Sequence, residues 1–126
     1  VDGVDPGMYR YLPLSHQLVF EFSDDMLSEK MVIASLGQTY PGKSAVTFIW
    51  TAIPYRMEWC YELAAHKVIA LDAGHVCQNL YLSAGTIDST VCAIAAYNDD
   101  AMNNVLGLDG ENQFVIYLAT VGKRYK

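Results

Sequence analysis

The chain of 126 residues is 52% hydrophobic, so it can build one compact domain but not two with separate cores. A formal net charge of −6, with no cluster of Lys and Arg before the last four residues, argues against a surface that binds nucleic acid. The amino-terminal residues do not resemble a signal peptide, and polar side chains interrupt the longest apolar stretch, so we expect no membrane span.

The amino-terminal region predicts a β-hairpin. Residues 7–11 and 17–22 are rich in aromatic and β-branched side chains, which are typical of strands. The intervening residues 13–16 have turn-forming character. We therefore expect two antiparallel strands at the start of the chain.

An amphipathic helix is predicted next, over residues 26–33, where apolar side chains recur at helical spacing. Three residues before it supply capping side chains and negative charge: Ser23, Asp24 and Asp25. Gly37 is expected to end this helix.

Residues 46–53 form a continuous apolar, β-branched run, which predicts a strand buried on both faces, and Pro54 ends it. Residues 55–85 then show a helical pattern, possibly in two pieces, that is apolar on nearly all sides. A chain this short has little mass of its own to cover such a helix. We therefore expect a second subunit to cover it.

The remaining elements are a strand, a short helix and a last strand. Residues 90–96 predict the first strand, residues 99–106 a helix capped by Asp99, and residues 114–121 a buried strand. With the preceding elements they predict an α+β fold in a single domain over residues 1–126.

One motif, Gly37 to Ser44, matches the spacing of a phosphate-binding P-loop, in which Lys43 would contact a nucleotide. That chemistry needs a strand before the glycine loop and a helix after it, so that the amides at the helix start point at the phosphates. Here a helix is predicted before the motif and a strand after it. The favoured interpretation is a surface loop, and nucleotide binding remains the alternative.

No metal site is predicted. Glu62 with His66 and Asp72 with His75 could each share a helix face, but further ligands at matching spacing are missing, so pairing on the helix surface or a satisfied buried polar contact is favoured. The three cysteines, at positions 60, 77 and 92, are too few and too widely spaced for a disulfide framework. They are expected to be small core residues of a cytoplasmic protein.

Three stretches, taken in order, resemble the nitroreductase superfamily and especially its SagB-type dehydrogenase branch. Residues 4–11, VDPGMYRY, are similar to the P-G-L-Y-R-Y hairpin of that branch. Residues 70–82, ALDAGHVCQNLYL, resemble its long central helix, which is written L-E-A-G-H-x-x-Q-N-L-x-L. Residues 91–97, the helix over 99–108 with its L-G-L ending, and residues 115–122 then follow in the family's order.

The resemblance implies a central, mostly antiparallel sheet flanked by helices, with a long buried helix at the interface of a homodimer. It also implies FMN at that interface, NAD(P)H as the reductant, and hydride transfer through the flavin to an unknown acceptor, small molecule or peptide. By resemblance, the flavin ring would lie beside the backbone of Ala93, Ile94, Ala95 and Ala96. Lys123 and Arg124 would face the FMN phosphate, although a solvated tail is the other interpretation of these charges. No catalytic side chain is identified.

Two departures from the family's pattern bear on the site. Ala96 stands where members usually carry a glycine, and the amino-terminal third of the family, with its FMN-phosphate motif, has no counterpart. The chain is therefore expected to be the carboxyl-terminal part of a nitroreductase-like domain, whose missing segment another chain could supply. The alternative function is a non-catalytic binding or scaffold subunit that has lost the flavin site.

Overall fold

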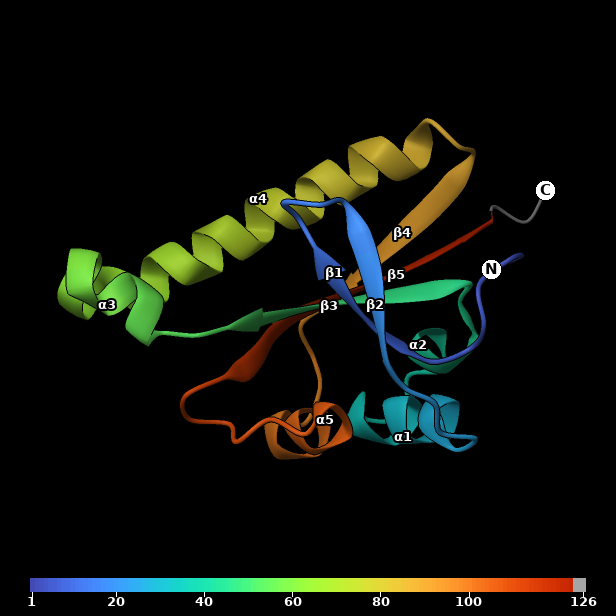
Figure 1. Ribbon diagram of the computed structural model, residues 1–126, viewed down its shortest axis with the longest axis horizontal. Helices are drawn as coiled ribbons and strands as arrows, with labels where there is room; N and C mark the ends of the chain where they lie inside the picture. The colour runs from blue at the N-terminus through green and yellow to red at the C-terminus, as the bar shows by residue number, and fades with distance from the viewer. Residues whose placement is uncertain (124–126) are drawn as a thin grey trace.

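The computed structural model describes residues 1–123 and has an α+β architecture (Figure 1). Two strands form a separate hairpin, three strands form a sheet, and the helices lie around that sheet. In chain order the elements are β1 (Met8–Leu12), β2 (Gln17–Phe22), α1 (Leu27–Ala34), α2 (Tyr40–Lys43), β3 (Val46–Ala52), α3 (Tyr55–Tyr61), the 3-10 turn η1 (Glu62–Ala64), α4 (Ala65–Gly85), β4 (Ser89–Ile94), α5 (Asp99–Leu106) and β5 (Phe114–Lys123).

The three-stranded sheet is antiparallel and has the order β3-β5-β4, so the last strand of the chain lies at its centre. The pairing is regular except at one point, where Trp50 faces Tyr117 but Thr51 faces Val115. Ile116 is therefore an extra residue in β5, a β-bulge. The bulge shifts the alternation of side chains by one, which brings Val115 and Leu118 to the same face.

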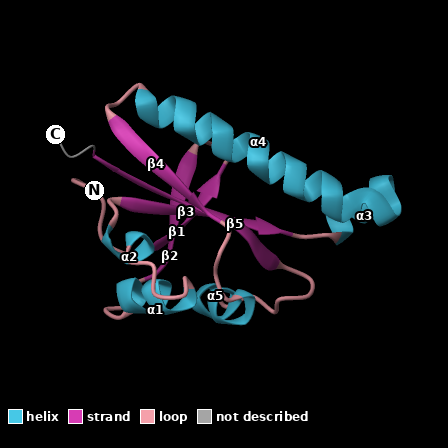
Figure 2. Cartoon of the chain, turned by 180° about the vertical axis from the view of Figure 1, so that it is seen from behind, coloured by secondary structure: helices cyan, strands magenta, loops and turns pink. Residues whose placement is uncertain are grey.

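Helices cover the two faces of this sheet from opposite sides, as Figures 1 and 2 show from front and back. On one face, α1 and α5 pack against the sheet around a core of Met31, Ala34, Ile94, Met102, Val115 and Leu118. Met102 and Leu118 are fully buried there. The other face is covered by α4, which packs on β4 and β5.

The long helix predicted over residues 55–85 is confirmed and is divided into α3 and α4 by the turn η1. Small side chains let α4 lie close to the sheet: Ala73, Cys77 and Ala84 are buried. The rest of its surface is open in the single chain, and Leu71 and Leu82 are 56% and 64% exposed. The expectation that the helix is enclosed on nearly all sides is therefore not met within this chain.

The expectation for β3 is wrong in one respect. The strand exists, but it is not buried on both faces: Val46 and Phe48 are exposed. They point to the same side of the sheet as α4, because they pair with Val121 and Ala119 of β5. Since α4 packs on β4 and β5, it leaves the β3 part of this face uncovered.

The predicted hairpin is confirmed as β1 and β2, which contact mainly each other. Arg10 and Glu21 form an ion pair of 2.8 Å across the strands, and the rings of Tyr9 and Phe20 meet edge to face. In Figure 1 the hairpin crosses in front of the sheet, and several of its large apolar side chains are exposed: Tyr11, Leu14, Leu18 and Phe20.

Side-chain capping at the two helix starts differs from the prediction. The N-cap residue of α1 is Met26, which makes no side-chain capping hydrogen bond, so the capping expected from Ser23, Asp24 and Asp25 is not formed on this helix. At the start of α1, a carboxylate oxygen of Asp24 accepts from the amide of Met26. At the start of α5 the cap is Asn98, whose side-chain oxygen accepts from the amide of Ala101, so Asp99 is the first helical residue and not the cap. The side-chain oxygen of Asn98, one residue before Asp99, can accept from a free N–H of the first turn as well as an aspartate oxygen can.

The surface of the chain is large for its mass. Residues of the chain expose 9028 Å², whereas a complete folded monomer of 14.0 kDa exposes about 6,700 Å². The difference is of the order of what a stable protein interface buries. Much of it is apolar, on the outer side of α4, on β3, and on α3, where Tyr55, Trp59 and Leu63 are exposed.

Candidate functional site

The segment predicted to face a flavin begins at the end of β4 and turns toward α5. Ala93 and Ile94 are the last residues of the strand, which lies at an edge of the three-stranded sheet. Ile94 points into the core, whereas Ala95 and Ala96 lie beyond the strand and are exposed. The structure thus brings these four residues to one sheet edge with two of them open to solvent.

Two hydrogen bonds hold this segment from different elements. The amide of Ala93 donates to the hydroxyl of Tyr81 on α4, at 3.0 Å. The carbonyl of Ala96 accepts from Nε2 of Gln38, at 2.7 Å. Among the described residues, the amides of Ala95 and Ala96 have no hydrogen-bond partner. They are donors that a ligand at this edge could use.

Lys123 is not adjacent to that segment. It is the last described residue of β5 and pairs with Ser89, at the opposite end of β4. Four residues of antiparallel strand separate Ser89 from Ala93, which corresponds to about 14 Å. Arg124, predicted to act with Lys123, lies outside the described residues. The predicted site therefore runs along β4, with amide donors at one end and a cation at the other.

Beside this edge, α4 and β5 bring together a polar cluster of Cys77, Tyr81 and Tyr117, in which Cys77 is buried, Tyr117 half-buried and Tyr81 exposed. Burial raises the pKa of the Cys77 thiol, while a hydrogen bond from Tyr117 lowers it in part. Burial also raises the pKa of Tyr117, and the nearby Cys77 and Tyr81 raise it further. Both groups are therefore held in their neutral forms at pH 7. Cys77 does not carry the thiolate that a nucleophile requires.

The motif that resembles a P-loop does not form one. Helix α1 precedes it, strand β3 follows it, and residues Tyr40–Lys43 form the one-turn helix α2 where a surface loop was expected. Gly42 packs against α1, and a Cβ added there would lie 2.5 Å from the carbonyl oxygen of Ser28. The hydroxyl of Ser44 is close to that of Thr47, at 3.1 Å. The close packing of α2 explains the glycine without any phosphate.

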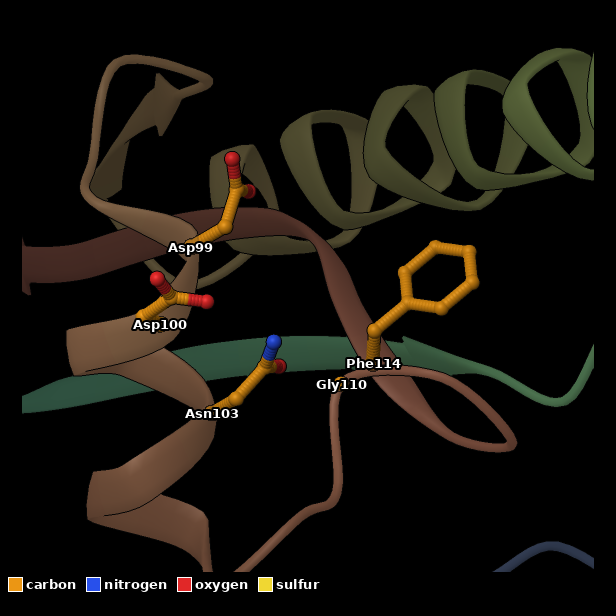
Figure 3. A pocket seen from close by; sticks show the side chains of 5 residues that line it. All are labelled: Asp99, Asp100, Asn103, Gly110 and Phe114. Atoms are coloured by element: carbon orange, nitrogen blue, oxygen red, sulfur yellow. The ribbon is translucent and has the colours of Figure 1, made fainter.

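A shallow pocket of about 320 Å³ lies between α5 and the start of β5, lined by Asp99, Asp100, Asn103, Gly110 and Phe114. In Figure 3, Asp100 and Asn103 extend from α5 toward the strand that carries Phe114. Asn103 is engaged in the fold, since its side-chain oxygen accepts from the amide of Val115 at 2.8 Å. Two carboxylates at the rim make the pocket unsuitable for a phosphate group.

The remaining candidates from the sequence form no site. Within the described part of the chain there is no group of three or more His, Cys, Asp or Glu that could hold a metal ion. The favoured surface pairing also fails: the ion pairs among the described residues include neither Glu62 with His66 nor Asp72 with His75. Cys77 is a core residue as expected, but Cys60 and Cys92 are exposed. No described helix has the length and apolar character needed to cross a membrane.

Sequence reasoning missed Gln38 and the role of Tyr81. Tyr81 bonds the backbone of β4 at Ala93, and Gln38 bonds the backbone beyond that strand at Ala96, 58 residues away in the sequence. Such contacts leave no periodicity, so no signal in one sequence could have found Gln38. Tyr81 lies in the stretch that resembles the family's central helix, but its bond to Ala93 depends on how α4 lies on β4.

Comparisons with known proteins agree with this architecture. The sequence model described as the nitroreductase family matches residues 4–123. A Methanocaldococcus jannaschii protein, whose name assigns it provisionally to the nitroreductases, is 25% identical over 124 residues, which cover 98% of this chain and 61% of that protein. The chain therefore spans less than two thirds of that relative.

Two solved structures share the fold. A crystal structure of an Anabaena variabilis protein, also named provisionally as a nitroreductase, has a TM-score of 0.88 and 28% identity, covering 96% of this chain and 25% of that one. A chain of the E. coli microcin synthetase McbBCD complex, solved with truncated pro-MccB17 bound, has a TM-score of 0.81 and 20% identity. The match covers 94% of this chain and 44% of that chain.

Proposed function

The chain belongs to the nitroreductase family, and from this we propose that it is part of an FMN-dependent oxidoreductase that takes hydride from NAD(P)H and passes it to an acceptor. Membership of the family suggests flavin-dependent oxidoreduction. The SagB-type dehydrogenase branch, which the sequence of the central helix resembles, is the proposed place within the family. The residues of this chain do not identify the electron acceptor, which is a small molecule or a peptide.

The observation that carries the proposal is the exposed end of β4. Within residues 1–123 the amides of Ala95 and Ala96 have no partner, both residues are exposed, and the backbone around them is anchored by Tyr81 and Gln38. Fixed amide donors of this kind stabilise negative charge that develops on a bound group. FMN would supply the hydride chemistry, and these amides would face the ring edge on which charge accumulates.

The far end of β4 is proposed to hold the phosphate. Lys123 is exposed, about 14 Å along the strand from Ala93, so the two ends suit an elongated cofactor with an apolar ring and an anionic tail. Arg124 is proposed to assist from outside the described residues. The methyl group of Ala96 replaces the usual glycine of the family, but Ala96 is exposed, so a ring can still approach the amide.

We also propose that the functional unit is a homodimer in which α4 is covered by a second copy, with a further segment completing the flavin site. The large exposed area and the open apolar residues of α4 support this arrangement. Placing a charge on the outer side of α4 should break the contact. Leu82→Glu is expected to shift the chain to the monomer mass in light scattering, while Leu14→Glu, in the exposed hairpin turn, should not.

Titration with FMN of the purified chain together with the segment that completes the flavin site tests the function. Saturable quenching of flavin fluorescence, followed by loss of the oxidised flavin absorbance when NAD(P)H is added without oxygen, is the expected result. A well-folded assembly that leaves FMN fluorescence unchanged would contradict the proposal. It would favour the second candidate, a non-catalytic scaffold subunit, to which the large apolar surface is equally suited.

A further inference from the structure

We propose that Gln38 is a positioning residue: its side-chain amide holds the carbonyl of Ala96, so that the neighbouring amides of Ala95 and Ala96 point at the flavin. This inference rests on the proposed function, since it assigns a task to those amides. Gln38 lies 58 positions before Ala96 in the chain, in the connection between α1 and α2. No contact of Gln38 with the cofactor is needed for this role.

One nitrogen of Gln38 makes two hydrogen bonds. Nε2 donates to the carbonyl of Ala96 at 2.7 Å and to the carbonyl of Ser35 at 3.0 Å. The second bond fixes the side chain against its own loop, because the backbone amide of Gln38 also donates to Ser35, at 3.1 Å. Both hydrogens of the side-chain amide are therefore used, and the bond to Ala96 has a defined direction.

The loop that presents Gln38 is strained and well anchored. Leu36 and Gly37 have φ values of 57° and 81°, and a left-handed conformation is sterically unfavourable for leucine. Ser35 beside them is completely buried. Backbone strain of this kind persists only where the surroundings determine it, and it is concentrated at functional sites. Here it turns the chain so that Gln38 faces the end of β4.

A second contact, from the last residue of α1, fixes the other side of the segment. The amide of Asn98 donates to the carbonyl of Ala34 at 2.8 Å. With Ala93 tied to Tyr81, the chain is held at residues 93, 96 and 98. Ile94 is also fixed in the core, and the hydroxyl of Tyr97 donates to the carbonyl of Val115 at 3.0 Å. The Gln38 bond is the one that holds the carbonyl of Ala96, between these anchors. Its loss releases the turn but leaves the core of α1, α5 and β5 intact.

Gln38→Leu tests the proposal, because leucine fills a similar volume without the donor. Gln113→Leu is the matched control, since Nε2 of Gln113 also donates across the fold, to Oγ1 of Thr51 at 3.0 Å, away from Ala96. In Gln38→Leu we expect FMN to bind roughly 2- to 13-fold more weakly, as the loss of one hydrogen bond implies, and the reduction potential of bound flavin to fall. Gln113→Leu should bind FMN as the wild type does.

Amide hydrogen exchange of the flavin-free chain provides a readout that does not depend on binding. Exchange at Asn98, whose amide donates to the carbonyl of Ala34 at the end of the same turn, should be faster in Gln38→Leu than in the wild type, with α4 unchanged, and Gln38→Asn, one methylene too short, should behave likewise. Unchanged exchange together with unchanged affinity and potential would overturn the proposal, as would equal effects in Gln113→Leu. If the wild-type assembly ignores FMN, the proposed function fails, and the exchange data alone decide whether Gln38 restrains the turn.

Discussion

Replacing Gly42 with alanine tests whether this glycine serves packing or phosphate binding. The added Cβ would lie 2.5 Å from the carbonyl oxygen of Ser28 and 2.8 Å from Cγ2 of Val32, both on α1. The first distance is about 0.9 Å shorter than the 3.4 Å at which ordinary contact begins. A backbone oxygen cannot rotate away, so α2 must move from α1. Overpacking of this kind costs about 1–3 kcal/mol.

For a domain of this size each kcal/mol corresponds to roughly 4 °C in the melting temperature, so Gly42→Ala should melt about 4–12 °C lower. Differential scanning calorimetry measures this directly. Gly85→Ala is the control, because a Cβ at Gly85 meets nothing within 4 Å, and it should stay within about 1 kcal/mol of the wild type. Lys43→Ala, at an exposed site, should also be neutral. The packing argument fails if Gly42→Ala melts with the wild type, and specific ATP binding lost in Lys43→Ala would revive the nucleotide interpretation.

Three further changes probe single groups. Ser35→Ala should raise the free energy of unfolding by about 1 kcal/mol in urea titrations, because the buried Ser35 hydroxyl has no partner among the described residues; a loss of stability would reveal an unseen bond. Backbone and side-chain hydrogen bonds, foremost that from the Gln113 amide, lower the pKa of Asp109 from 3.8 to about 2. The stability it contributes is therefore present above pH 4 and lost toward pH 2, and Asp109→Asn should flatten this part of a melting-temperature profile. Burial raises the pKa of Tyr97 from 10.0 to about 12, so stability should fall between pH 10 and 12, and less so in Tyr97→Phe, as thermal melts would show.

Local patterns in the sequence predicted most elements of the fold. The hairpin, the helix after Asp24, the break in the helical region 55–85 and the last strand all appear where residue spacing placed them. These features depend on neighbours within a few residues, which one sequence contains. The cap of α5 was misplaced by one residue because Asn98 and Asp99 are both good caps, and only the backbone geometry selects between them.

Burial and the detail of the site were less predictable, because both depend on long-range packing. An apolar run such as Val46 to Ala52 indicates that a strand can be covered, but not that the cover belongs to the same chain. The placement of Ala93 to Ala96 at a sheet edge follows from the pairing of β4 with β5. Their contact with a flavin, like that of Lys123, stays a prediction. Gln38 could be found only from coordinates, since its partner lies 58 residues away.

The position of β3 at an edge of the three-stranded sheet has a consequence for how the protein is assembled. Natural sheets protect an edge strand with charged residues or proline, and β3, with the sequence VTFIWTA, has neither. An edge strand of this kind can pair with an extended polypeptide, including the same strand of another molecule. During refolding, assembly with the correct partner then competes with aggregation. Low protein concentration and low temperature should reduce aggregation and increase the yield of native protein.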